Sequence, residues 1–200
     1  MTEEISGLPT RRAALRLLDT VMRMGTPLDQ ATANATKGLS PPDRALAIAV
    51  AQETLRWSVD LDQLIDSKTK QPLPDDAKAR MVLRLALAQI LRLGTPAHAA
   101  IATALPLVDG GPRRLVHGVL GSLLRAEATL PDLPSLPEAV MMRWHPVWGD
   151  EMIAGAQAAL SEPPPLDLAL RDASATKAWA ERLGGVSLMP GHVRLPRGTA

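Results

Sequence analysis

The chain has 200 residues, and its 22 Lys and Arg against 21 Asp and Glu give a formal net charge of +1. This balance excludes nucleic-acid binding driven by a strong overall positive charge, so any such site must be a local patch. The chain has no Cys, which excludes disulfides, thiolate metal sites and a cysteine nucleophile within it. It also lacks Phe and Tyr and is rich in Ala and Leu, a composition that favours helices.

Glycine and proline turns divide the first 130 residues into segments whose apolar side chains recur at helical spacing. Six or seven helices joined by such short turns predict a globular helical domain. The predicted helices are Thr10 to Gly25, Pro27 to Gly38, Ser40 through Trp57 toward Leu64, Asp75 to Gly94, Thr95 to about Val108, and the segment from Pro112 to Arg125.

The helical pattern ends at Pro131. Pro131, Pro134 and Pro137 predict a linker. Glu138 to Leu160 predicts one or two further helices with a bend near Pro146. After three consecutive prolines, Leu166 to Leu170 alternates like a strand, Ser174 to Leu183 is helical in pattern, and Val193 to Leu195 suits a second strand. A strand, helix and strand that stop at Ala200 leave sheet edges unpaired, so we expect this α/β subdomain to be incomplete.

Segments of the helical region carry a recognisable pattern. They are Arg11-Arg12-Ala13-Ala14, Asp43-Arg44-Ala45-Leu46, Glu53-Thr54-Leu55-Arg56-Trp57, Leu83-Arg84-Leu85, and Pro96-Ala97-His98-Ala99-Ala100. Together they resemble the NusB-like RNA-binding region at the front of the bacterial small-subunit rRNA cytosine-5 methyltransferases. Arg143-Trp144, Trp148-Gly149 and Pro164 to Leu168 are similar to that family's connector into an RRM-like subdomain. Val116 to Gly121 departs from the pattern because it lacks the family's Asn and Arg.

The resemblance implies a mainly α fold, related to that of the transcription antitermination factor NusB. It divides the chain into a NusB-like helical domain at 5–130, a helical connector at 131–162, and the start of a small α/β subdomain at 163–200. The family's glycine-rich cofactor loop and two catalytic cysteines are missing from this sequence. We therefore expect no enzyme activity and no cofactor in this chain. S-adenosylmethionine would bind only to a methyltransferase domain that the chain lacks.

Two groups of arginines are candidate RNA-binding residues. Arg11, Arg12 and Arg16 lie on successive turns of the first predicted helix, and Arg113 and Arg114 begin a later one. Contact with RNA phosphates is the functional interpretation, and a solvated helix face is the ordinary one.

Other polar residues lie inside strongly apolar helices, where a structural role is the better interpretation. We expect Arg44, Arg56 and Arg84 to join helices by pairing with carboxylates such as Asp43, Glu53 and Asp62. Gln89 is expected to be a buried polar tie, and His98 a hydrogen-bonded structural histidine. The histidines show no metal-ligand spacing, so no metal site is predicted. The four Trp occur at apolar spacing, which favours core packing over base stacking.

The function expected from the resemblance is that of an RNA-binding module for rRNA processing, which positions rRNA for a cytosine-5 methyltransferase. The alternative is a protein-interaction or docking scaffold of NusB type that does not touch RNA. Expected partners are rRNA and the missing methyltransferase domain in cis, with a homodimer as a further option. The acidic N-terminus is no signal peptide, and the longest apolar run is far shorter than a membrane span. We therefore expect a cytoplasmic protein with no membrane partner.

Overall fold

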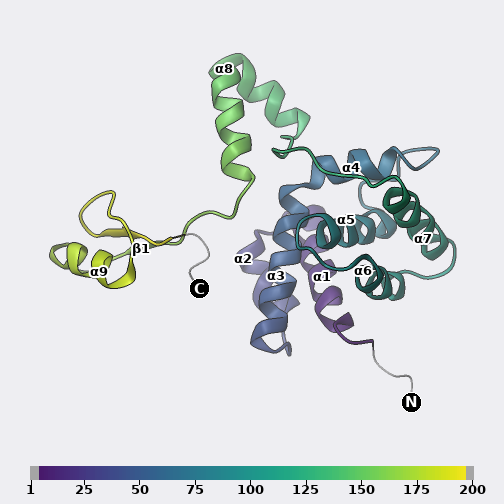
Figure 1. Ribbon diagram of the computed structural model, residues 1–200, viewed down its shortest axis with the longest axis horizontal. Helices are drawn as coiled ribbons and strands as arrows, with labels where there is room; N and C mark the ends of the chain where they lie inside the picture. Colours follow the sequence, from purple (N-terminus) through teal and green to yellow (C-terminus); the bar gives the residue numbers. More distant parts are fainter. Residues whose placement is uncertain (1–4, 197–200) are drawn as a thin grey trace. The chain divides into compact units, whose positions relative to one another are not determined.

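The computed structural model describes residues 5–196. The chain divides into two compact units, the first ending at Val140 and the second beginning at Met141, and each is described by itself. The first unit is helical, and Figure 1 shows its helices in order along the chain. Their bounds are α1 Leu8–Met24, α2 Leu28–Ala35, α3 Pro41–Arg56, α4 Ser58–Asp66, α5 Lys78–Leu91, α6 Ala97–Ala104, the 3-10 turn η1 Leu105–Leu107, and α7 Gly110–Arg125.

The mainly α fold predicted from the sequence is confirmed, and the helices end where the turn residues predict. Gly25 closes α1 in the left-handed conformation, with its N–H directed at the carbonyls of Thr20 and Val21. Trp57 separates α3 from α4, so the long predicted helix breaks there into two. Ser40 caps α3 by accepting a hydrogen bond from the backbone N–H of Asp43.

The carboxylate of Asp43 joins the start of α3 to α1. It accepts hydrogen bonds from the Ser40 hydroxyl at 2.6 Å and from the Thr10 hydroxyl of α1 at 2.9 Å. These bonds, from Ser40 first and Thr10 second, lower the pKa of Asp43. Asp43, in the first turn of α3, thereby links α3 to α1.

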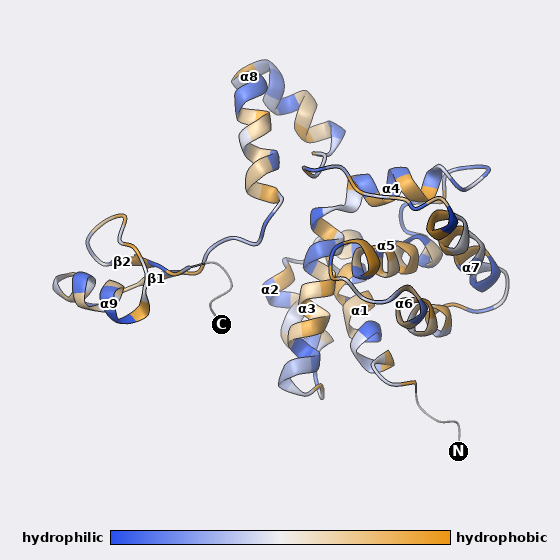
Figure 2. Cartoon of the chain, in the orientation of Figure 1, coloured by the Kyte–Doolittle hydropathy of each residue, from blue (hydrophilic) through white to orange (hydrophobic). Residues whose placement is uncertain are grey.

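Helix α5 is the centre of the first unit. Every residue from Ala79 to Gln89 is buried, and α1, α3, α4, α6 and α7 all pack against it. Figure 2 shows α5 largely in the hydrophobic colour, as expected for a helix enclosed on all sides. Leu83 and Leu87 join the apolar cluster formed with α4, α6 and α7, whereas Met81 and Leu85 join the cluster formed with α1, α2 and α3.

Two arginines of this central helix are buried and carry carboxylate partners. The side chains of Arg80 and Arg84 are each 2% exposed. Arg84 forms a two-pronged ion pair with Asp62 of α4, with Nε to Oδ1 at 2.7 Å and Nη2 to Oδ2 at 2.6 Å. Arg80 bonds the same carboxylate at 2.9 Å and Asp66 at 2.6 Å. Asp62 therefore balances two charges that have left water.

The second unit contains most of α8 Glu138–Leu160, then β1 Asp167–Ala169, η2 Ala173–Ala175, α9 Thr176–Leu183 and β2 His192–Arg194. Helix α8 is broken at Gly149, three residues beyond the predicted bend at Pro146, because Gly149 adopts a φ of 70°. The strands pair antiparallel, with Asp167 opposite Arg194. Among residues 5–196, no helix is both long and apolar enough to cross a bilayer.

Replacing Asp62 should destabilise the first unit strongly. Asp62→Asn removes the shared counter-charge of two buried guanidinium groups, so the free energy of unfolding should fall by about 3 kcal/mol. Asp75→Asn is the matched control, because Asp75 is 95% exposed and lies 4.0 Å from Arg84. That variant should cost less than about 0.5 kcal/mol. Urea unfolding measures both, and equal losses would contradict a special role for Asp62.

The strand pair of the second unit should weaken in acid. Hydrogen bonds from Arg194 hold the pKa of Asp167 down at about 2, against an ordinary value of 3.8. The stability that this carboxylate adds to the strand pair is therefore fully present above about pH 4. It is lost as the pH falls toward 2, because the carboxylate becomes protonated. Amide hydrogen exchange at Val193 should accelerate across that window, after correction for the intrinsic pH dependence. Asp167→Asn should remove this step, and a step that persists in the variant would assign it to another group.

Candidate nucleic-acid interface

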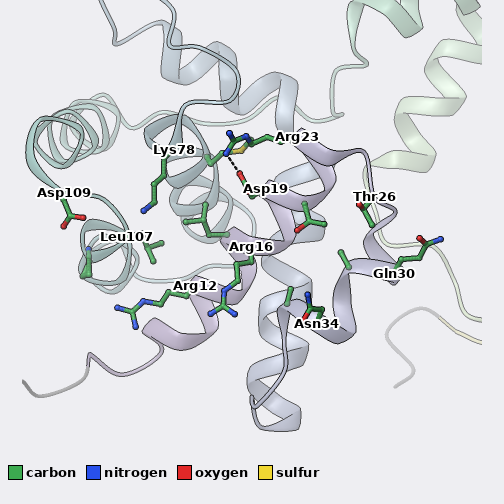
Figure 3. Close-up of a pocket in the computed structure, with 16 residues that line it drawn as sticks. Arg12, Arg16, Asp19, Arg23, Thr26, Gln30, Asn34, Lys78, Leu107 and Asp109 are labelled. Carbon is green, nitrogen blue, oxygen red and sulfur yellow. Dashed lines mark hydrogen bonds and ion pairs between the residues drawn. The ribbon is translucent and has the colours of Figure 1, made fainter.

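A groove of about 720 Å³ lies on the first unit, along the exposed face of α1. Helix α2 borders it on one side, and the start of α5 and the η1 segment border it on the other (Figure 3). Leu15 and Pro106 supply its partly exposed apolar surface, and the buried Ala31, Ala35, Met81 and Leu107 lie beneath it. The groove is therefore assembled from segments that are distant in the sequence.

Positive charge predominates in the groove. Arg12, Arg16, Arg23 and Lys78 line it, against Asp19 and Asp109. Arg23 and Asp19 neutralise each other through an ion pair of 2.9 Å, one turn apart on α1. Arg12, Arg16 and Lys78 are exposed, and their side chains have no hydrogen bond or ion pair with another described residue. These three cations are available to an anionic ligand.

Neutral polar groups border the groove on the side of α2. Gln30 and Asn34 of α2 line it there, with Thr26 before α2 and Thr20 on α1. In Figure 3 the Gln30 side chain points away from Arg12 and Arg16. Neither these residues nor Lys78 could be identified from the sequence. Each is an ordinary surface residue in its own segment, and only the packing of α2 and α5 beside α1 brings them to one groove.

Arg11 is separated from Arg12 and Arg16, with which the sequence grouped it. Its Nε donates a 2.8 Å hydrogen bond to Oε1 of Gln89, which is 0% exposed. Burial lowers the pKa of Arg11, an effect that Asp43 partly opposes. Gln89 in turn donates to the Leu85 carbonyl at 3.0 Å. Successive helix residues point about 100° apart, so Arg11 faces α5 while Arg12 faces the groove.

Arg113 and Arg114 form a separate basic site. Both are exposed at the beginning of α7, and neither lines the groove of α1. Their side chains form no hydrogen bond or ion pair within the described part of the chain. The structure therefore divides the five candidate arginines into a pair in the groove (Arg12 and Arg16), the half-buried Arg11 bonded to Gln89, and a second exposed pair (Arg113 and Arg114).

The arginines expected to be structural also differ from one another. Arg84 forms the buried pair with Asp62, and Arg56 pairs with Glu53 of its own helix. Arg44 is instead exposed, with no ion pair to any residue that the structure describes. It lies in the first turn of α3, before the buried Ala47 and Val50.

His98 is also exposed, and no hydrogen bond of its side chain to a described residue is present. It belongs to the first turn of α6, before the buried Ala100. Within residues 5–196, no cluster of three His, Asp or Glu side chains could hold a metal ion.

The tryptophans do not all pack into the core. Trp57 does, at 1% exposure, and the Arg92 guanidinium lies 4.5 Å from its ring centroid. Trp148 and Trp179 of the second unit are 63% and 39% exposed. Helical spacing identified the apolar face of these segments, but it could not show whether another segment covers that face.

Comparison with known proteins relates the first unit to one family. The model of the NusB family matches residues 8–125. "Ribosomal RNA small subunit methyltransferase B" of Xanthomonas campestris pv. campestris is 29% identical over 153 residues, which are 73% of this chain and 35% of that protein. The chain thus spans about a third of the length of that relative.

One solved structure has the same fold. A chain of "Crystal Structure of a Plectonemic RNA Supercoil" superposes with a TM-score of 0.55 over 60% of this chain and 94% of that chain. The two sequences are 18% identical, so this likeness concerns the fold alone.

Adjacent arginines of α1 should respond differently to the same substitution. Arg11→Gln removes the guanidinium that satisfies buried Gln89, so the free energy of unfolding should fall by about 1–2 kcal/mol. Arg12→Gln changes an exposed side chain and should alter that free energy by less than about 0.5 kcal/mol. Urea unfolding of the two variants tests the difference. A larger loss for Arg12→Gln would show that the groove arginine supports the fold.

Proposed function

Because the chain belongs to the NusB family, we propose that its helical unit binds RNA through the groove of α1. The observation that carries the proposal is the set of three unpaired cations, Arg12, Arg16 and Lys78, around one hollow surface. The chain as a whole is almost neutral, so this concentration of positive charge is local. Phosphate groups are the anions that such a surface favours in RNA.

The geometry of α1 suits contact with a phosphate backbone. Arg12 and Arg16 are one turn apart, about 6 Å along the helix axis, so one strand can contact both. A guanidinium binds phosphate oxygens through two parallel N–H donors. Arg23 is less available, because its Nη1 already donates to Asp19. Arg113 and Arg114 would add contacts at a second place on the same RNA.

The wider role we propose is that of a module which positions rRNA for cytosine-5 methylation. The name of the Xanthomonas campestris relative and the motifs shared with its family support this role. The chain has no Cys and so lacks the family's catalytic cysteines. S-adenosylmethionine and the methyl transfer therefore belong to a methyltransferase domain in cis. Methylation of rRNA would place the protein in the cytoplasm.

A second candidate function, docking to protein, is favoured by the second unit. Val186, Leu188 and Met189 are 59%, 60% and 62% exposed, and Leu166 is 48% exposed. Exposed apolar side chains near one another are a feature of protein-contact surfaces. In this alternative the chain serves as a scaffold, and RNA binding is left to the catalytic domain.

Binding to a small-subunit rRNA fragment should be salt-dependent and should require the groove arginines. Three phosphate contacts predict about 20- to 40-fold weaker binding on raising the salt from about 50 to about 200 mM. Arg12→Gln and Arg16→Gln should each weaken binding and reduce the slope of log affinity against log salt by about one. Fluorescence anisotropy with a labelled RNA measures both quantities.

The matched control is Arg44→Gln, which removes the same charge from an exposed site outside the groove. It should leave the affinity and the salt slope unchanged. Absence of binding at low salt would overturn the RNA role and favour the docking alternative. If Arg44→Gln weakened RNA binding as much as Arg12→Gln, the loss would be due to the change in total charge and not to the groove.

A further inference from the structure

The buried guanidinium of Arg84 is better satisfied on one side than on the other. Its Nε and Nη2 donate to the carboxylate of Asp62 at 2.7 and 2.6 Å. In the described part of the chain, its Nη1 donates to the thioether sulfurs of Met81 and Met22, at 3.4 and 3.6 Å, and to the Asp75 carbonyl at 3.4 Å. Sulfur is a weak acceptor, and 3.4 Å is long for an N–H···O bond. One nitrogen of a buried cation therefore lacks a strong acceptor.

The two methionines beside this nitrogen differ in their access to solvent. Met81 lies on the central helix α5 and is 2% exposed. Met22 lies in the last turn of α1 and is 36% exposed. Both line a cleft of about 430 Å³ that Arg84 also borders. A small oxidant in solution can therefore reach the Met22 side chain, whereas burial protects Met81.

We propose that Met22 is a redox-modification site, oxidised by a hydroperoxide to a sulfoxide that Arg84 binds. A lone pair of the sulfur attacks one oxygen of the hydroperoxide, so that an S–O bond forms and the O–O bond breaks. The sulfur loses two electrons, and the hydroperoxide is reduced to an alcohol, or to water in the case of hydrogen peroxide. The proton of the attacked oxygen passes to the departing oxygen. This proposal does not depend on RNA binding.

The distance between the Met22 sulfur and Nη1 of Arg84 fits the oxidised product. The two atoms are 3.6 Å apart. A sulfoxide oxygen about 1.5 Å from the sulfur can lie about 2.8 Å from Nη1 across this gap, with an angle of about 110° at the oxygen. Such a separation is typical of a charge-assisted hydrogen bond. Oxidation thus supplies a strong oxygen acceptor to Nη1 without a movement of α1 or α5.

The effect of this oxidation on stability should be the reverse of the usual one. A sulfoxide in place of a thioether disrupts apolar packing, because it puts a polar group where an apolar one was. Met22 is partly exposed, so its sulfoxide stays in contact with water while it gains a cationic donor. Hydrogen bonds to charged groups contribute more to stability than neutral ones. Oxidised Met22 should therefore strengthen the attachment of α1 to α5.

The test is urea unfolding of the whole chain before and after mild treatment with hydrogen peroxide. Peptide mass spectrometry identifies which methionines have gained an oxygen atom. The chain has eight Met, so the wild type is compared with Met22→Leu to isolate this site. The ratio of the folding equilibrium constants after and before oxidation should be about tenfold higher in the wild type than in Met22→Leu.

Met24→Leu is the matched control, since Met24 lies on the same helix, is 73% exposed and does not line the cleft beside Arg84. This variant should respond to oxidation as the wild type does. Circular dichroism checks that both variants fold. If Met22 stays unmodified under conditions that oxidise Met24, the modification site is overturned. If Met22 is oxidised and the wild type gains no more stability than Met22→Leu, binding of the sulfoxide by Arg84 is overturned.

Discussion

Burial of α5 on all sides is the constraint on which the first unit depends. A helix enclosed by α1, α3, α4, α6 and α7 supplies both apolar clusters, yet it also carries two arginines that are 2% exposed. Removing a guanidinium from water is costly unless a carboxylate neutralises it. Asp62 meets this requirement for Arg80 and Arg84 together, which fixes α4 against α5. The apolar packing around α5 then fixes the remaining helices.

The same requirement explains how the arginines of the chain are used. Those that face α5 are neutralised or hydrogen-bonded, as Arg11 is by Gln89. Arg12 and Arg16, which point away from the core, have no described partner. Helix α1 therefore carries two functions on two faces, packing on one and exposed charge on the other. A near-neutral chain can present a cationic groove because its positive and negative charges are unevenly distributed.

Sequence periodicity and turn residues predicted the helical fold and most helix ends, because helix formation and termination depend on neighbouring residues. The opposite charges of Arg84 and Asp62 allowed their pairing to be predicted. That Arg80 binds the same carboxylate could not be predicted. Arg44 and His98 lie in apolar sequence and are nevertheless exposed, because each lies in the first turn of its helix, before the first buried residue. Lys78 and Asn34 could not be foreseen, because residues 44 positions apart line the same groove only through tertiary packing.

Because packed helices form the groove, little of it has to become ordered when a ligand binds. Its lining comes from α1, α2, α5 and η1, all of which belong to the packed helical unit. The backbone that carries Arg12, Asn34 and Lys78 is ordered by folding, so binding has to restrict only side chains. Ordering one long side chain at an interface costs about 0.5–1.5 kcal/mol, which a charge-assisted hydrogen bond can offset. A small number of contacts on a preorganised surface can therefore give useful affinity for an anionic ligand, even in a chain whose total charge is close to zero.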